Sequence, residues 1–173
     1  MLASGADRAL LEAHLPAQAV VDRLIANYWI RIHPIARTVH RPSFERQYQN
    51  FWIRVNMGME PRSSFQAVLF AALLSSVISI DEHTMRTEYG VEKRTLVDSF
   101  REGAEAALAK ANFLRTTKLE TLQAFVMYLV SLVSFRCAES YCLVHQRQHI
   151  SVFERWLPIP KSDISILDSL VSQ

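Results

Sequence analysis

The chain has 173 residues, which is the length of one domain or of one domain with a tail. Half of the residues are hydrophobic and 10% are aromatic, which suffices to fill a core and excludes a compositionally disordered chain. The net charge of +2, from 19 basic and 17 acidic residues, is smaller than expected of a domain whose main task is gripping a phosphate backbone. Only 4 Gly residues argue against a turn-rich sandwich or barrel, and 2 Cys residues cannot form a disulfide framework, which fits a reducing intracellular setting.

No targeting segment or membrane span is predicted. Asp7 and Arg8 interrupt the first ten residues, which argues against a signal peptide. The longest apolar stretch, residues 67–80, contains three Ser residues and is shorter than the roughly 20 apolar residues that a bilayer span needs. We therefore expect a buried core helix there and no membrane contact.

The first two predicted helices cover residues 16–32 and residues 42 to about 57. His33-Pro34 ends the first, because the residue before a proline disfavours the α region, and Gly58 and Pro61 mark the next break. Each helix carries apolar residues at the spacing of one helical face. These faces consist of Val21, Leu24, Ile25, Tyr28, Trp29 and Ile32, and of Phe44, Tyr48, Phe51, Trp52 and Val55.

The third predicted helix starts at Ser63, which forms a capping-box pattern with Gln66. Residues 67–74 are apolar on every face, so this helix is expected at the centre of the fold. Residues 81–90 are polar and are predicted to form a loop. A fourth helix over residues 91–113 carries a narrow seam with many small residues, which allows close helix approach. The seam consists of Leu96, Phe100, Ala104, Ala107, Leu108 and Ala111.

The fifth predicted helix opens with a second capping-box pattern, Thr117 with Glu120, and runs to Val133. It is apolar nearly all round, like the third. The sequence therefore predicts an all-α fold: an irregular multi-helix bundle with two buried central helices and no sheet.

Four pieces of the sequence, taken with their order and spacing, carry a resemblance. They are His33-Pro34 with residues 40–52, then residues 61–71, residues 106–114 and residues 119–124. Together they resemble the N-terminal part of the fungal-specific transcription factor domain, the middle homology region of zinc binuclear-cluster transcription factors. The resemblance covers residues 15–133. Its signature residues here are His33, Pro34, His40, Arg41, Pro42, Ser43, Phe44, Leu122 and Gln123.

The resemblance implies a regulatory domain that modulates transcription in a fungal nucleus through protein partners or a small effector, without catalysis or a cofactor of its own. A homodimer and a role in secondary metabolism are further expectations. Zinc is implied only for a six-cysteine DNA-binding module that has no counterpart in this sequence. The protein is therefore expected to contact DNA only through that missing module. Two alternatives remain open: a small-molecule binder or enzyme on the same helices, and a non-functional truncated fragment with an exposed apolar patch.

The expected domain organisation is a disordered N-terminus at residues 1–14, the truncated regulatory domain at residues 15–133, and a divergent tail with short helices at residues 134–173. The family pattern normally continues for about another hundred residues, but it is lost after Val133. A clipped gene model, read-through into non-coding sequence, or a genuine short paralogue would each produce this pattern.

Candidate sites are few, and no catalytic, cofactor-binding or metal site is predicted. His33 and His40, with Arg37 and Arg41, suggest an anion pocket or an acid–base pair, but we favour a structural role in which His33 caps a helix and His40 bonds across the loop. The aromatic face of residues 44–52 has the spacing of a core face rather than of a base-stacking platform.

A C-x4-C-x2-H-x3-H run near the end of the chain has residue types that suit zinc. The two residues between its second Cys and its first His are too few to form a finger, so chance clustering is the favoured interpretation. The run consists of Cys137, Cys142, His145 and His149.

Overall fold

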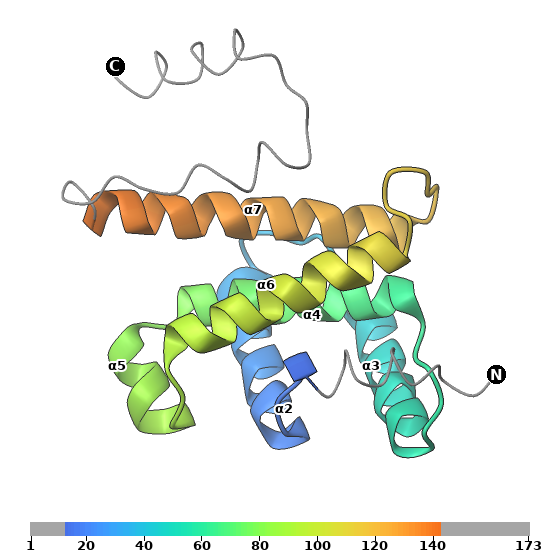
Figure 1. Ribbon diagram of the computed structural model, residues 1–173, viewed down its shortest axis with the longest axis horizontal. Coiled ribbons are helices and arrows are strands. Elements are labelled where there is room, and N and C mark those ends of the chain that lie inside the picture. Colours follow the sequence, from blue (N-terminus) through green and yellow to red (C-terminus); the bar gives the residue numbers. More distant parts are fainter. Residues whose placement is uncertain (1–12, 143–173) are drawn as a thin grey trace, which may run out of the picture. The chain divides into compact units, whose positions relative to one another are not determined.

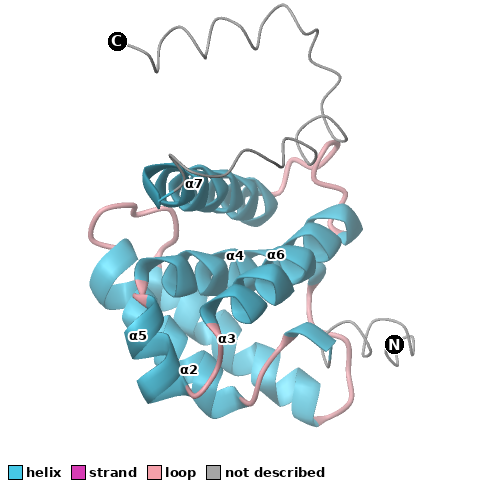
Figure 2. Ribbon diagram, turned by 60° about the vertical axis from the view of Figure 1, so that its left-hand side comes forward, coloured by secondary structure: helices cyan, strands magenta, loops and turns pink. Residues whose placement is uncertain are grey.

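The computed structural model describes residues 13–142, with side chains described up to residue 135, and all regular elements within this range are helical (Figures 1 and 2). The predicted all-α class is confirmed. The elements are α2 (Gln18–Asn27), the π-helical turn η1 (Tyr28–Ile32), α3 (Arg41–Asn56), α4 (Ser63–Ser79), α5 (Glu82–Thr84), the π-helical turn η2 (Met85–Tyr89), α6 (Lys93–Lys110) and α7 (Leu119–Cys142).

The chain divides into two units, residues 1–137 and 138–173, and the first contains every helix except the last residues of α7. The predicted disordered N-terminus falls almost wholly, and the predicted short tail helices largely, outside the described residues. The predicted domain boundaries stay predictions.

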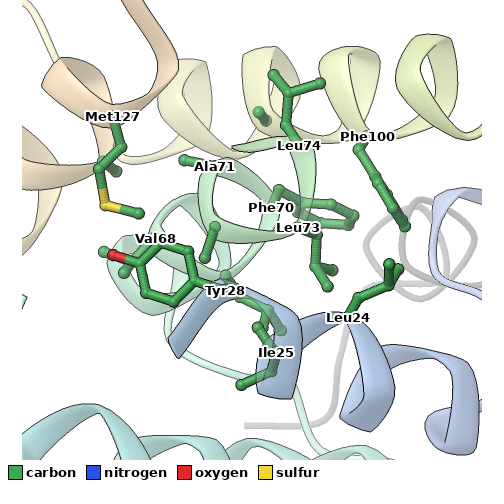
Figure 3. Close-up of a cluster of buried hydrophobic side chains, with 14 of the residues drawn as sticks. Leu24, Ile25, Tyr28, Val68, Phe70, Ala71, Leu73, Leu74, Phe100 and Met127 are labelled. Atoms are coloured by element: carbon green, nitrogen blue, oxygen red, sulfur yellow. The ribbon is translucent and has the colours of Figure 1, made fainter. Parts of the chain in front are cut away.

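Helix α4 forms the centre of the first unit, as predicted. All residues from Ser64 to Leu74 are buried, which agrees with the apolar character of the helix on every face. It contacts α2, η1, α3 and α6. Figure 3 shows residues of α2, η1, α6 and α7 gathered around it, among them Leu24, Tyr28, Phe100 and Met127.

The capping box predicted at the start of α4 is wrong. The N-cap residue is Arg62, and no side chain makes the capping hydrogen bond. Gln66 is buried, and its Nε2 donates to the carbonyl oxygen of Pro61 at 2.9 Å. Burial favours this bond, because a buried amide must find a partner and the preceding loop supplies a nearby acceptor.

Helix α6 packs closely on α4 through its predicted seam of small residues. Ala104 and Ala107 are fully buried, and so is the ring of Phe100. The two helices come very close at Gly103, where an added Cβ would lie 2.7 Å from Cε1 of Phe70. Gly103 therefore lets the two helices approach more closely than any larger residue would.

The prediction of a loop over residues 81–90 is wrong, because the segment forms α5 and η2. The Asp81 side chain caps this segment by accepting hydrogen bonds from the backbone N–H of Thr84 at 2.8 Å and from its Oγ1 at 2.7 Å. Met85 is fully buried and anchors the turn to the core. Gly90, at φ +66°, ends it in the left-handed region that favours glycine.

Helix α7 is where the prediction of a second buried central helix fails. One face is buried, but several apolar side chains between Leu119 and Val133 are 45–69% exposed. The apolar composition of a helix does not determine how many of its faces are packed. In the described part of the chain, α7 is packed on one side only.

Among the described helices, no single one is long and apolar enough to cross a bilayer. The pair Ser63–Ser79 and Glu82–Tyr89 meets the length and composition criteria together, with a bend of 110° between the two.

Candidate interaction surface

The first signature segment folds around the indole of Trp29. The ring of His33 meets it edge-on with centroids 4.7 Å apart, and Phe44 meets it edge-on at 5.2 Å. The guanidinium of Arg41 lies over the same indole at 5.1 Å and pairs through its Nε with a Glu45 carboxylate oxygen at 2.7 Å. These signature residues therefore fix the corner between η1 and α3.

The two signature histidines both hold local structure. The backbone N–H of His33, the C-cap residue of η1, donates to the carbonyl of Tyr28 at 2.9 Å. Burial lowers the pKa of His33, and the nearby positive charges of Arg37 and Arg41 lower it further, which disfavours the charged imidazolium form. Nδ1 of His40 lies 3.0 Å from the hydroxyl oxygen of Ser43, across the first turn of α3.

The aromatic face of α3 packs into the core, as its spacing predicts. Phe44 and Phe51 are buried, and both lie against Phe65 of α4, with ring centroids 5.3 and 6.1 Å from it. Tyr48 is half-buried and donates a hydrogen bond to Asp22 of α2. These rings therefore serve as packing surface rather than as a stacking platform for bases.

Three hydrogen bonds join the start of α7 to the first signature segment and its neighbours. Nε2 of Gln123 donates to the carbonyl oxygen of Thr38 at 2.7 Å, across 85 positions of sequence. The Glu120 carboxylate accepts from the hydroxyl of Ser64 at 2.7 Å and from Nε2 of Gln47 at 2.8 Å. Glu120 thus ties α7 to α3 and α4, instead of forming the capping box predicted with Thr117, and a charged acceptor strengthens both bonds.

The packed face of α7 combines small and polar side chains with the larger buried side chains of Met127 and Tyr128. Ala124 and Thr121 are fully buried, and Ser131 is 3% exposed. The hydroxyl oxygens of Ser131 and Ser75 lie 2.6 Å apart, and the hydroxyl of Tyr128 donates to the Glu105 carboxylate at 2.5 Å. Hydrogen bonds therefore hold this face of α7 to α4 and α6.

The opposite face of α7 carries a row of exposed aliphatic side chains, which we call the α7 stripe. At 100° per residue, its members fall within about 80° of one another around the helix. The predicted signature residue Leu122 belongs to it. The stripe consists of Leu119, Leu122, Val126, Val130 and Val133, which are 69%, 45%, 49%, 53% and 61% exposed.

The α7 stripe could not be predicted from the sequence, because some polar residues of α7 are buried while some aliphatic residues are exposed. Polar Thr121 and Ser131 lie inside, while Val126 and Val130 lie outside. No periodicity in the sequence signals that choice. A contiguous exposed apolar row on a folded unit is typical of a contact surface.

The described residues contain no group of three or more His, Cys, Asp or Glu side chains placed to hold a metal ion. The predicted C-x4-C-x2-H-x3-H run lies outside that search. Cys137 and Cys142 belong to the last turns of α7, where side chains are not described, and His145 and His149 lie beyond the described residues.

The chain is similar to several curated fungal transcription regulators. It is 29% identical over 140 residues to an uncharacterized transcriptional regulatory protein of Schizosaccharomyces pombe, covering 80% of this chain and 22% of the relative. It is 32% identical to the aurofusarin cluster transcription factor of Gibberella zeae, covering 58% of this chain and 15% of that protein. It is 33% identical to a C6 finger domain transcription factor of Arthroderma gypseum, covering 60% and 15%.

The matched part is thus a small portion of each relative, between 15% and 22% of its length. No family model matches the chain. No solved structure matches it either. The resemblance predicted from the sequence is nevertheless confirmed by these relatives: the chain is similar to fungal transcription regulators, one of them named as a C6 finger domain transcription factor, over 58–80% of its length in these comparisons.

Proposed function

We propose that this chain is a non-catalytic regulatory domain that modulates transcription in the nucleus through protein contacts, and that the α7 stripe is its contact surface. The observation that carries the proposal is the stripe itself: five aliphatic side chains between Leu119 and Val133 face outward on a helix whose other face is buried. An apolar row of this kind costs solubility, so its exposure favours a surface that is covered by a partner.

Two residues of segment 119–124, which carries part of the resemblance, support this proposal because they position the stripe. Gln123 and Glu120 bond α7 to the η1–α3 corner and to α3 and α4, and these bonds fix which side of α7 faces outward. In this proposal, the residues that mark the resemblance act by orienting a surface rather than by binding a ligand.

DNA contact belongs, in this proposal, to a separate zinc-cluster module, and no zinc or other cofactor is assigned to this domain. Relatives carry names that include "C6 finger domain", and two are named for the aurofusarin and pyriculol/pyriculariol biosynthesis clusters. By analogy with those names, we propose that the regulated genes belong to a secondary-metabolite cluster.

The proposal is tested by fusing the 173-residue chain to a heterologous DNA-binding domain and measuring a reporter gene in a fungal host. We expect the fusion to change transcription relative to the DNA-binding domain alone, and we expect Val126→Lys to remove most of that change. Val126 is 49% exposed, so the longer side chain reaches solvent without disturbing the core. A wild-type fusion that leaves the reporter unchanged at equal nuclear levels would contradict the proposed function.

A further inference from the structure

The side chain of Lys93, in the first turn of α6, reaches back to the end of α4. Its Nζ donates hydrogen bonds to the carbonyl oxygen of Ile78 at 3.0 Å and to that of Ile80 at 2.6 Å. The segment between these two points, residues 81–92, contains α5 and η2. The amine of Lys93 therefore holds the two ends of this segment together.

The carboxyl end of α4 depends on side chains from other elements for its hydrogen bonds, because the last four carbonyl groups of a helix have no partners within it. The carbonyl oxygen of Ser76 accepts from Nδ2 of Asn27 at 3.3 Å. That of Ser79 accepts from Nη1 of Arg31 at 3.4 Å. The two bonds of Lys93 are shorter than either, and its positive charge lies at the negative end of the helix dipole.

Lys93 is also placed to react. It is half-buried, but Glu92 and Arg94 on either side are exposed, so its amine can be reached from solvent. Burial lowers the pKa of Lys93, although the carboxylates of Asp81 and Glu82 act in the opposite direction. The neutral amine, which is the nucleophilic form, is therefore more abundant than in an ordinary lysine. Its two N–H groups match the two carbonyl acceptors, which leaves the lone pair free to attack.

We propose that Lys93 is a site of acylation by an acyl thioester, and that acylation releases residues 81–92 from the end of α4. Neutral Nζ attacks the carbonyl carbon of the thioester and a C–N bond forms. The C–S bond breaks, the thiolate leaves with the bonding pair, and the proton that Nζ loses passes to solvent. The product amide has one N–H and no charge, so one of the two carbonyl oxygens loses its partner and the end of α4 loses a cation.

Incubation of the full 173-residue chain with acetyl coenzyme A at about pH 8, followed by mass spectrometry of its peptides, tests the reactivity. Lys118 is the internal control, because it is exposed and lies in the same chain. We expect acetylation to be about threefold faster at Lys93 than at Lys118, since the larger neutral fraction outweighs the partial burial. A rate at Lys93 that is no higher than the rate at Lys118 would overturn the inference.

The structural consequence is tested by hydrogen exchange on a chain in which Lys93 is the only lysine, with Lys110, Lys118 and Lys161 replaced by Arg. After acetylation, amides of residues 81–92 should exchange about tenfold faster, while those of α7 should keep their rates. Lys93→Gln should exchange like the acetylated chain, and Lys93→Arg, which keeps the charge and the donors, should exchange like the unmodified one. Unchanged exchange over residues 81–92 after acetylation would overturn the inference. The inference goes beyond the proposed function and does not involve the α7 stripe, so its failure would leave that function standing.

Discussion

The close approach of α4 and α6 at Gly103 gives a prediction whose size can be worked out from the contact distances. In Gly103→Ala, the new Cβ would lie 2.7 and 2.8 Å from two carbons of the Phe70 ring, inside normal contact. The ring cannot move aside, since it is fully buried and packs beside Phe100 with centroids 6.4 Å apart. Overpacking of this kind lowers the free energy of unfolding by about 1–3 kcal/mol, and the higher helix propensity of alanine relative to glycine raises it by about 1 kcal/mol. We therefore expect a net loss of about 1 kcal/mol in the free energy of unfolding.

Urea unfolding followed by circular dichroism measures this loss, and a second background tests its cause. Phe70→Leu removes the ring atoms that meet the new methyl group. In that background, Gly103→Ala should stabilise the protein, because the propensity gain remains while the clash is gone. A loss of equal size in both backgrounds would refute the reasoning, since the two residues would then not be coupled.

Two further predictions concern the signature segments. Glu120→Ala should lower the free energy of unfolding by about 2 kcal/mol, because it leaves the buried Ser64 hydroxyl without its acceptor; an unchanged urea midpoint would contradict this. The pKa of His33 is lower than 6.5 in the folded state. As the pH falls below 6.5, the unfolded state therefore binds more protons than the folded state, and the free energy of unfolding decreases. His33→Gln should therefore lose less stability than the wild type between about pH 7.5 and about pH 5.5 in urea titrations, and equal losses in both proteins would show that His33 does not contribute.

The sequence predicted those parts of the fold whose burial depends on local pattern. Residues 67–74, apolar all round, lie in the centre of the unit, and the small-residue seam of α6 packs closely on α4. Residues 81–90 were not predicted as helical, because a short polar segment gives no periodic signal. Their structure depends on one capping side chain, Asp81, and one buried anchor, Met85.

The contact surface could not be predicted, for two physical reasons. Which face of α7 is packed depends on contacts with distant residues, such as the contact of Ser131 with Ser75, as well as on the burial of Met127 and Tyr128, and the apolar residues of the sequence lie on both faces. The bond from Gln123 to Thr38 spans 85 positions, so its existence depends on the fold as a whole. The signature residues were identified from the resemblance, but the contact of Gln123 with Thr38 is seen only in the structure.

The central claim, that regulation depends on the α7 stripe, is tested most directly by one reporter measurement on two matched sets of lysine substitutions. Each member of both sets is an exposed aliphatic residue at least 45% accessible, so both sets add the same charge at comparable exposure. We expect the reporter response to be lost across the stripe set and kept across the other; equal responses in the two sets at equal nuclear levels would contradict the account. The stripe set is Leu119, Leu122, Val126, Val130 and Val133, and the comparison set is Ile30, Ile35, Ile53, Met57 and Leu114.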